Sequence, residues 1–269
     1  MNESEYRKIK FTIKKHLDLD LEFYKSNQMM RRLSGFTSRV GATSIGEFCR
    51  LIATDAKVRE ILMNFLTINV TEFFRDKRHF DALRSKVLPE ILQKNPRPRI
   101  WSAGSSKGAE AYSVAMMIED IAPGTKAQIF GTDIDVRMIA LARAGGPYPD
   151  AEAKNITESL RRKYMEQRDG GYFVVPEIRS KVIFKEQNLL TDKFDRNFDL
   201  IMCRNVVIYF SDAAKLELNN KFSKSLKPGG ILFIGGTETI LNPQDVGFER
   251  DGAAFYRKEN IPGRIRQAA

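Results

Sequence analysis

The stretch IWSAGSSKGAEAYSVA, residues Ile100–Ala115, decides the fold class of this 269-residue chain. It begins with a short apolar segment, breaks at Gly104, crosses a turn of small residues to Gly108 and continues with a helical pattern. This order predicts a buried strand, a tight turn and a helix. Glycines at such a turn let a ligand approach the backbone, and the helix N-terminus offers free N–H groups. The turn is therefore the first candidate ligand site.

The sequence on the C-terminal side of this stretch alternates between strands and helices. Buried strands are predicted at QIFGTD (128–133), DLIMC (199–203) and ILFIGG (231–236), with helical patterns between them. Such alternation indicates a mostly parallel, doubly wound sheet, so we expect an α/β, Rossmann-like domain. The rhythm is interrupted at about 148–187, where a helix and then GYFVVPEIRSKVIF predict a small antiparallel β insertion.

The sequence on the N-terminal side of the stretch has a helical pattern. In EYRKIKFTIKKHL (5–17), apolar residues recur at helical spacing and lysines occupy the other face. KNPRPR (94–99) is a polar break that contains two prolines. We therefore predict a small all-helical domain over residues 1–92 and the α/β domain over residues 93–269.

Composition narrows the class of protein. No apolar run approaches the roughly 18 residues that span a bilayer, and the N-terminus lacks the apolar core of a signal peptide. We expect a cytoplasmic protein that does not insert into a membrane. Two cysteines and two histidines disfavour a metal site and a histidine-based triad. The net charge of +10 favours an acidic partner (nucleic acid, an anionic membrane or an acidic protein) or serves solubility alone, and does not choose among these.

Polar residues follow three of the predicted strands. They are the Gly104–Gly108 turn, Asp133 and the pair Arg204-Asn205. Ligands of open α/β sheets bind beyond the carboxyl ends of the strands, and a carboxylate at such an end suits ribose hydroxyls. The turn is not GxGxxG, which disfavours a dinucleotide. The order of these residues predicts a nucleoside-bearing cofactor, while Asp133 as a cap of the next helix is the alternative.

A further polar patch lies outside the predicted strands, in TINVTEFFRDKRHF (67–80). Asn69, Thr71 and Arg75 alternate with apolar side chains in this segment. One interpretation is a helix start with Thr71 as its N-cap, and the other is a ligand-facing loop. Tyr209, after the apolar strand, is either a buried tyrosine with a satisfied hydroxyl or a functional one.

Taken together, these segments resemble the chemotaxis receptor methyltransferases (CheR), which are bacterial S-adenosylmethionine-dependent glutamate O-methyltransferases. The resemblance covers nearly the whole chain, and the FFR and CRNVxIYF motifs are its specific parts. It is carried, in this order, by INVTEFFRDKRHF, IWSAGSSKGAEAYS, GTDID, NLL (188–190), FDLIMCRNVVIYF and KPGGILFIGGTE.

The resemblance implies roles for individual residues. Arg75 would pair with the methionine carboxylate, Glu110 with its ammonium group, and Asp133 with the ribose. Arg75 and Tyr209 would be the catalytic residues. The cofactor-binding residues would be Asn69, Thr71, Arg75, Gly104, Glu110, Asp133, Asn188, Leu189 and Asn205.

The resemblance also implies partners. The substrates would be methyl-accepting chemotaxis receptors, the product would be S-adenosylhomocysteine, and we expect a monomer. Arg31, Arg32 and Arg39 are candidates for a face that docks a glutamate-rich receptor helix. Methylation of nucleic acid is disfavoured, because it rests on basicity alone and CRNV stands where base methyltransferases commonly carry [DN]PP[YF].

The departures from the family pattern fall in the glycine turn. The family usually reads close to GCSTGEEPYS, and here Ser105, Lys107, Ala109 and Ala111 replace the cysteine, threonine, first glutamate and proline, while Glu110 is retained. Lys107 adds a cation near a ligand that is itself cationic at sulfur. The alternative function is therefore a catalytically weakened S-adenosylmethionine-binding module in a signalling complex.

Overall fold

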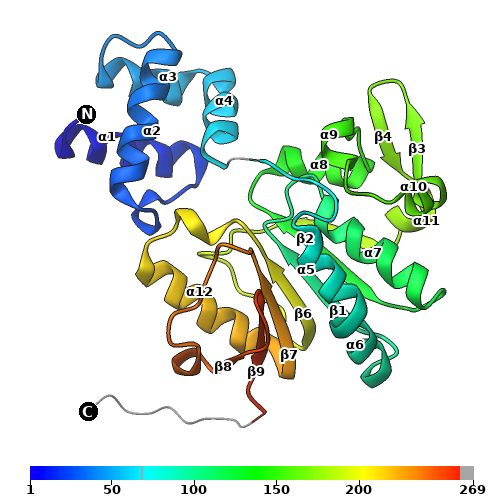
Figure 1. Ribbon diagram of the computed structural model, residues 1–269. Helices are drawn as coiled ribbons and strands as arrows, with labels where there is room; N and C mark the ends of the chain where they lie inside the picture. Colours follow the sequence, from blue (N-terminus) through cyan, green and yellow to red (C-terminus); the bar gives the residue numbers. More distant parts are fainter. Residues whose placement is uncertain (68, 261–269) are drawn as a thin grey trace, which may run out of the picture. The chain divides into compact units, whose positions relative to one another are not determined.

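The protein is described here by a computed structural model that covers residues 1–67 and 69–260 (Figure 1). The described chain divides into two compact units. One contains residues 1–67 with 208–215, and the other contains residues 69–207 with 216–260. Within these residues, no helix combines the length and the apolar character that a membrane crossing requires.

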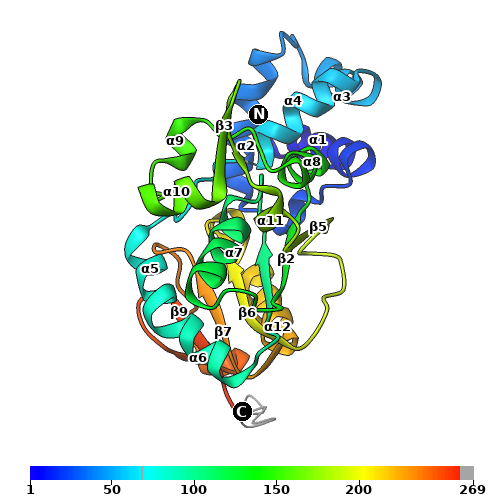
Figure 2. The same cartoon turned by 90° about the vertical axis from the view of Figure 1, so that its right-hand side faces the viewer.

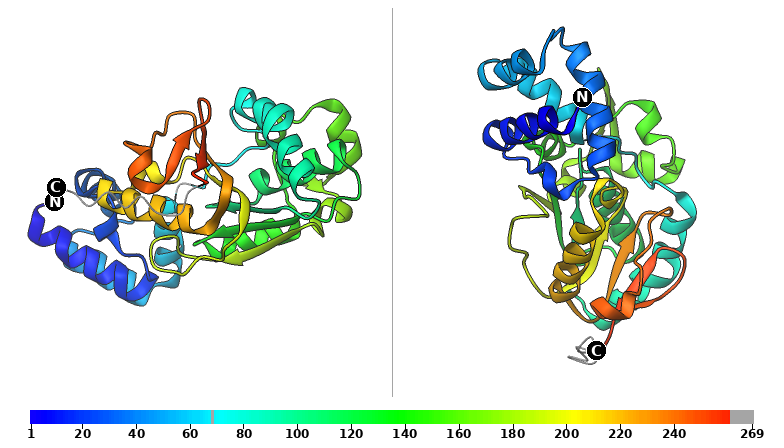
Figure 3. Two further views of the ribbon diagram at one scale, coloured as in Figure 1. Left: turned by 90° about the horizontal axis from the view of Figure 1, so that it is seen from below. Right: turned by 90° about the vertical axis from the view of Figure 1, so that its left-hand side faces the viewer.

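The first unit is a cluster of helices, drawn in blue and cyan in Figure 3. They are α1 (Glu3–Leu17), η1 (Leu21–Phe23), α2 (Ser26–Arg39), α3 (Ile45–Thr54) and α4 (Ala56–Thr67). Their apolar faces form a core that includes the fully buried side chains of Ile9, Phe36 and Phe48. The segment 208–215 joins this unit through backbone bonds, because Lys25 N–H donates to the Tyr209 carbonyl (3.1 Å) and Ser211 N–H to the Phe23 carbonyl (2.8 Å).

The second unit is built on a sheet. Within residues 69–260, seven strands pair in the order β5-β2-β1-β6-β7-β9-β8. Neighbours from β5 to β7 are parallel, whereas β9 is antiparallel to both β7 and β8. The bounds are β1 (Arg99–Ala103), β2 (Gln128–Asp133), β5 (Val182–Glu186), β6 (Phe198–Cys203), β7 (Leu226–Ile234), β8 (Phe248–Arg250) and β9 (Phe255–Lys258). The predicted mostly parallel α/β architecture is confirmed.

Helices cover both faces of this sheet. Successive strand residues point to opposite faces: Ile100 belongs to the core shared with α5 to α8, while the Trp101 ring contacts Phe222 of α12. Trp101 is 2% exposed, and its Nε1 donates to the Thr132 hydroxyl at 2.9 Å. The helical bounds are α5 (Lys77–Ala82), the π-helix η2 (Leu83–Val87), α6 (Leu88–Lys94), α7 (Ala109–Ile121), α8 (Val136–Ala144), η3 (Val207–Tyr209), α12 (Asp212–Ser225) and η4 (Pro243–Val246).

A hairpin interrupts the alternation of strands and helices, as the sequence predicts. It pairs β3 (Met165–Arg168) with β4 (Gly171–Val174) in antiparallel register, next to α9 (Asp150–Ala153) and α10 (Glu158–Tyr164) in both Figure 1 and Figure 2. The short helix α11 (Pro176–Arg179) follows. The segment VIF, however, is not part of this antiparallel insertion, because it belongs to β5 and pairs in parallel with β2.

The structure also divides the chain at a different place from the predicted boundary at residue 92. Helices α5, η2 and α6 belong to the second unit. Their side chains Phe80, Leu83, Leu88 and Ile91 lie in one buried cluster with strand and α7 residues. An amphipathic pattern shows that a helix buries one face, but it does not show against which core.

Candidate functional site

The glycine turn lies at the carboxyl end of β1 and is fixed by the neighbouring strand. Gly104 and Gly108 have φ of 77° and 87°, values that favour glycine. The N–H groups of Gly104 and Ser105 both donate to the Thr132 carbonyl at 2.8 Å, and Ser106 N–H donates to Asp133 Oδ2 at 2.7 Å. The end of β2 therefore holds the shape of the turn.

Asp133 stands at the end of β2 and is 8% exposed. Burial raises the pKa of this carboxyl, and hydrogen bonds from backbone N–H groups oppose the shift. Its Oδ1 accepts the Asp135 N–H at 2.9 Å. The alternative role as a helix cap falls to Asp135, whose carboxylate accepts the Arg137 N–H at the start of α8. Asp133 therefore fastens the glycine turn to β2.

Asn69 lies at the same end of β2, bonded to a residue that no sequence pattern indicated as its partner. Its Nδ2 donates to Asp135 Oδ2 at 2.9 Å, and Asp135 is 1% exposed. Sequence reasoning missed Asp135, although the acidic pair in GTDID was visible. The two carboxylates therefore have different partners: Asp133 bonds to the glycine turn and Asp135 bonds to Asn69.

The FFR segment forms a tight loop before α5. Phe73 is fully buried, and Phe74 adopts a φ of 49°, which is rare for a bulky residue. The Phe74 N–H donates to Ser113 Oγ of α7 at 3.0 Å. The helix begins after Asp76, so Thr71 is not its N-cap and lies in the loop instead.

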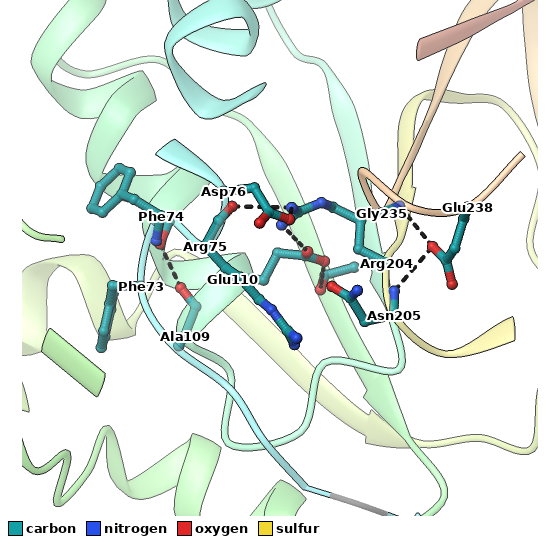
Figure 4. Close-up of polar contacts among 12 residues, drawn as sticks. Phe73, Phe74, Arg75, Asp76, Ala109, Glu110, Arg204, Asn205, Gly235 and Glu238 are labelled. Carbon is teal, nitrogen blue, oxygen red and sulfur yellow. Dashed lines mark hydrogen bonds and ion pairs between the residues drawn. The ribbon is translucent and has the colours of Figure 1, made fainter. Parts of the chain in front are cut away.

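Arg204 connects this loop to α7, the helix that follows the glycine turn (Figure 4). Its guanidinium donates to Asp76 Oδ2 at 2.6 Å, to the Arg75 carbonyl at 3.0 Å and to Glu110 Oε2 at 3.4 Å. The Arg204 side chain is 2% exposed and lies over the rings of Phe80 and Phe233. Arg204 was noticed at a strand end but given no role. The structure makes it the centre of the network.

Glu110 is held from a second side, by the Ser102 hydroxyl, which donates to Oε1 at 2.7 Å. Its side chain is 15% exposed, so the carboxylate is fixed and partly accessible. Arg75 lies one residue before Asp76, and its guanidinium donates to the Val70 carbonyl at 3.4 Å. Arg204 thus links the Arg75 backbone to the Glu110 carboxylate, so these two predicted residues belong to one hydrogen-bond network.

Asn205 follows Arg204 with a φ of 59°. Its N–H donates to Glu238 Oε2 at 3.0 Å, and Gly235 N–H donates to the same oxygen at 2.6 Å. Burial raises the pKa of the Glu238 carboxyl, and the nearby Arg204 charge opposes this shift. Sequence reasoning missed Glu238, although the GGTE motif after a buried strand was quoted as part of the resemblance.

Asn188 and Leu189 follow β5, the strand next to β2. The Asn188 side chain accepts the Leu190 N–H at 3.0 Å, and Leu189 is 7% exposed. Gln187 N–H donates to the Asp133 carbonyl at 2.9 Å. The structure therefore brings this pair to the same edge of the sheet as Asp133.

The remaining predicted residues belong to the first unit. Arg31 and Arg39 are exposed on α2. Arg32 differs from the expectation, because its side chain donates to the Phe65 carbonyl. Its guanidinium lies 4.8 Å from the ring centroid of Phe65 and 5.8 Å from that of Tyr209. Burial lowers the pKa of this guanidinium. Arg32 therefore packs within the unit instead of presenting a free charge.

Lys107, the departure that raised doubt about the turn, does not carry an unbalanced charge. Its Nζ lies 2.6 Å from Glu152 Oε1 in α9, with side chains 15% and 20% exposed. Ala109 and Ala111 are fully buried in α7, where small side chains fit. The substituted positions are therefore built into the packing of the turn.

The polar atoms at this edge suit a ligand with a nucleoside and an amino acid group. Among the residues that the structure describes, Ser106 Oγ, Asn205 Oδ1 and Glu238 Oε1 are buried without a hydrogen-bond partner. Buried polar atoms normally have partners, and these three lie in or beside the turns that follow β1, β6 and β7. The fixed carboxylate of Glu110 suits a cationic group and that of Asp133 suits hydroxyls.

Comparison with known proteins agrees with this geometry. The family model described as "CheR methyltransferase, SAM binding domain" matches residues 69–252, and "CheR methyltransferase, all-alpha domain" matches residues 4–67. A chemotaxis protein methyltransferase of Listeria monocytogenes is 37% identical over 95% of this chain and 98% of its own length. A probable one of Rhizobium etli is 33% identical over 87% of this chain and 91% of its own. The chain belongs to the CheR methyltransferase family.

Proposed function

We propose that this protein transfers the methyl group of S-adenosylmethionine to glutamate side chains of chemotaxis receptors. The observation that carries the proposal is the network around Arg204, which brings the Arg75 loop and Glu110 to the carboxyl edge of the sheet. The Glu110 carboxylate and the Arg75 guanidinium, which belong to one network through the Arg75 backbone, would match the two charges of an amino acid.

The cofactor roles follow from this arrangement. Glu110 holds the ammonium group of the cofactor, Arg75 its carboxylate, and Asp133 the ribose hydroxyls. Gly104 allows close approach of the backbone. The remaining residues of the site are Asn69, Thr71, Asn188, Leu189 and Asn205. When bound, S-adenosylmethionine supplies a methyl group on a cationic sulfur.

The chemistry places few demands on the protein. A glutamate side chain has a pKa near ~4.3, so the accepting carboxylate is already ionised and no general base is needed. The protein's task is to align the carboxylate with the methyl carbon and to exclude water. We assign this positioning to Arg75 and Tyr209, as the family resemblance implies.

Receptor recognition rests on charge. The chain carries a net charge of +10, and a positive surface attracts glutamate-bearing helices over several ångströms. Arg31 and Arg39 expose their side chains on α2 and are the docking residues we propose. Arg32 is left out of this pair because of its contacts within the first unit.

Transfer of a labelled methyl group to receptor signalling-domain fragments tests the proposal. We expect base-labile label, because a glutamate methyl ester hydrolyses to methanol whereas methylated amines do not. Arg75→Ala should weaken S-adenosylmethionine binding about tenfold or more, since it removes charge-assisted hydrogen bonds. Tyr209→Phe should lower kcat with little change in cofactor affinity.

The alternative, a binding module without catalysis, predicts a different result from the same experiment. A protein that bound the cofactor in calorimetry but transferred no label to any receptor fragment would support the module. The motive for this alternative was the altered glycine turn, and the ion pair of one of its substituted residues, Lys107, with Glu152 favours the enzyme.

A further inference from the structure

One short segment, residues 148–155, contacts both the side-chain ammonium and the backbone carbonyl of Lys107. We call this segment the strap. The Lys107 Nζ pairs with Glu152 Oε1 at 2.6 Å and lies 5.7 Å from the centroid of the Tyr148 ring. The Tyr148 hydroxyl donates to the Lys107 carbonyl, and Tyr148 is fully buried. The direction of the lysine side chain is therefore set by the strap.

The strap also holds the FFR loop. The Phe73 N–H donates to the Glu152 carbonyl at 2.9 Å, and Asn155 Nδ2 donates to the Phe73 carbonyl at 3.4 Å. The rings of Phe73 and Tyr148 pack edge to face, with centroids 4.7 Å apart. Glu152 thus contacts both segments that carry the amino-acid end of the proposed cofactor site, with its side chain on one and its backbone on the other.

Charge gives Glu152 a further role. Lys107 is the only charged residue of the Gly104–Gly108 turn. With its side chain 15% exposed, its charge is screened less by water than a surface charge would be. An unpaired ammonium here would repel a ligand with a cationic sulfur. It would not repel in the same measure the demethylated product, whose sulfur is neutral.

We propose that Glu152 is a specificity-determining residue that neutralises Lys107, so that a glycine turn carrying a lysine still accepts a sulfonium ligand. The inference rests on the proposed function, because it concerns the same site. It goes further in assigning the balance between substrate and product affinity to an ion pair outside the set of cofactor-binding residues. The pair tunes the charge of the turn, while the residues at the strand ends hold the ligand.

Calorimetry with S-adenosylmethionine and S-adenosylhomocysteine as separate titrants tests this. In Glu152→Gln, we expect the Kd of S-adenosylmethionine to rise about five- to tenfold and that of the product to change less than about twofold. In Lys107→Met, the unpaired carboxylate should shift the ratio of the two Kd values in the opposite direction. The double variant should return the ratio to within about twofold of the wild-type value.

The control is Glu119→Gln. Glu119 pairs with Lys181 at 2.7 Å, with side chains 12% and 26% exposed, so it offers the same chemical change in a similar environment at the far end of α7. Its ratio of Kd values should equal that of the wild type. Melting curves of every variant show that the protein is folded.

The outcomes separate the two proposals. Equal weakening of both ligands in Glu152→Gln would give Glu152 a merely structural role and overturn this inference alone, and so would an unchanged ratio in Lys107→Met. A folded wild-type protein that bound neither ligand would overturn the proposed function and this inference with it.

Discussion

Glu238 shows how a single buried carboxylate organises the candidate site. One of its oxygens accepts two backbone N–H groups, from Asn205 and Gly235. The other is buried without a partner among the described residues. This environment stabilises the protonated form, since burial raises the pKa above the ordinary value of 4.5.

The raised pKa of Glu238 predicts a pH-dependent contribution to stability. Between pH 4.5 and the raised pKa, the folded state binds more protons than the unfolded state, so the stability contributed by this group falls as the pH rises. Glu238→Gln removes this dependence. Its Tm minus that of the wild type should therefore increase between about pH 4 and pH 7, as measured by calorimetric melts at intervals of half a pH unit.

A constant difference in Tm across this range would contradict the prediction. Glu217→Gln is the matched control, because it makes the same change at an exposed position of α12. It should not reproduce the pH-dependent increase.

Long-range partners explain why sequence reasoning found some site residues and missed others. Asp133 and Asn205 were identified because they lie at or just beyond the carboxyl ends of apolar strands, and parallel strands bring these ends to one edge. The role of Arg204 depends on Asp76, 128 residues away, and no local pattern reveals such a pair. Buried charges whose partners are distant in sequence become visible only in the folded chain.

At the scale of elements, the turn between β1 and α7 depends on Gly108. This residue has a φ of 87°, and a Cβ would lie 2.6 Å from Phe184 Cζ and 3.1 Å from Ala142 Cβ. Gly108→Ala should therefore lower the free energy of unfolding by about 2 kcal/mol or more, from backbone strain and overpacking together. Urea denaturation measures the change.

A glycine within a helix gives the contrasting prediction. Gly35 lies in the interior of α2, and a Cβ would meet nothing within 4 Å. Gly35→Ala should raise the free energy of unfolding by about 0.5–1 kcal/mol, because alanine loses less backbone entropy in a helix. If both alanine variants changed stability in the same direction, the geometry assigned to these two glycines would be wrong.

Periodicity located most elements but not always their neighbours. The alternation of apolar strands and amphipathic helices correctly predicted the parallel sheet. The segment VIF was assigned to the antiparallel insertion, because an isolated apolar run does not reveal its partner strand. Helices α5 and α6 were placed in the N-terminal domain for the same reason, since their apolar faces fit any helical or sheet surface.

At the scale of the whole molecule, the net charge of +10 predicts salt-sensitive receptor recognition. Reversing both exposed charges, in Arg31→Glu with Arg39→Glu, should raise the KM for receptor fragments about fivefold or more at low salt, and the effect should shrink as ionic strength rises. The affinity for S-adenosylmethionine should stay the same. Methyl-transfer kinetics at several salt concentrations measure both quantities.

The matched control reverses two other exposed charges, in Lys86→Glu with Arg97→Glu. Both double variants change the net charge by the same amount. If they raised the KM equally, the total charge would matter and the α2 arginines would have no special role in docking.

The position of Trp101 gives the molecule a built-in optical reporter. It is the only tryptophan of the chain, and it is packed against the rings of Phe194 and Phe222 in the second unit. Its emission will shift to longer wavelength only when that unit opens and water reaches the indole ring. Far-ultraviolet circular dichroism also records the loss of α1 to α4. Superimposing the two unfolding curves will therefore show whether the helical unit and the sheet unit melt in one cooperative step or separately.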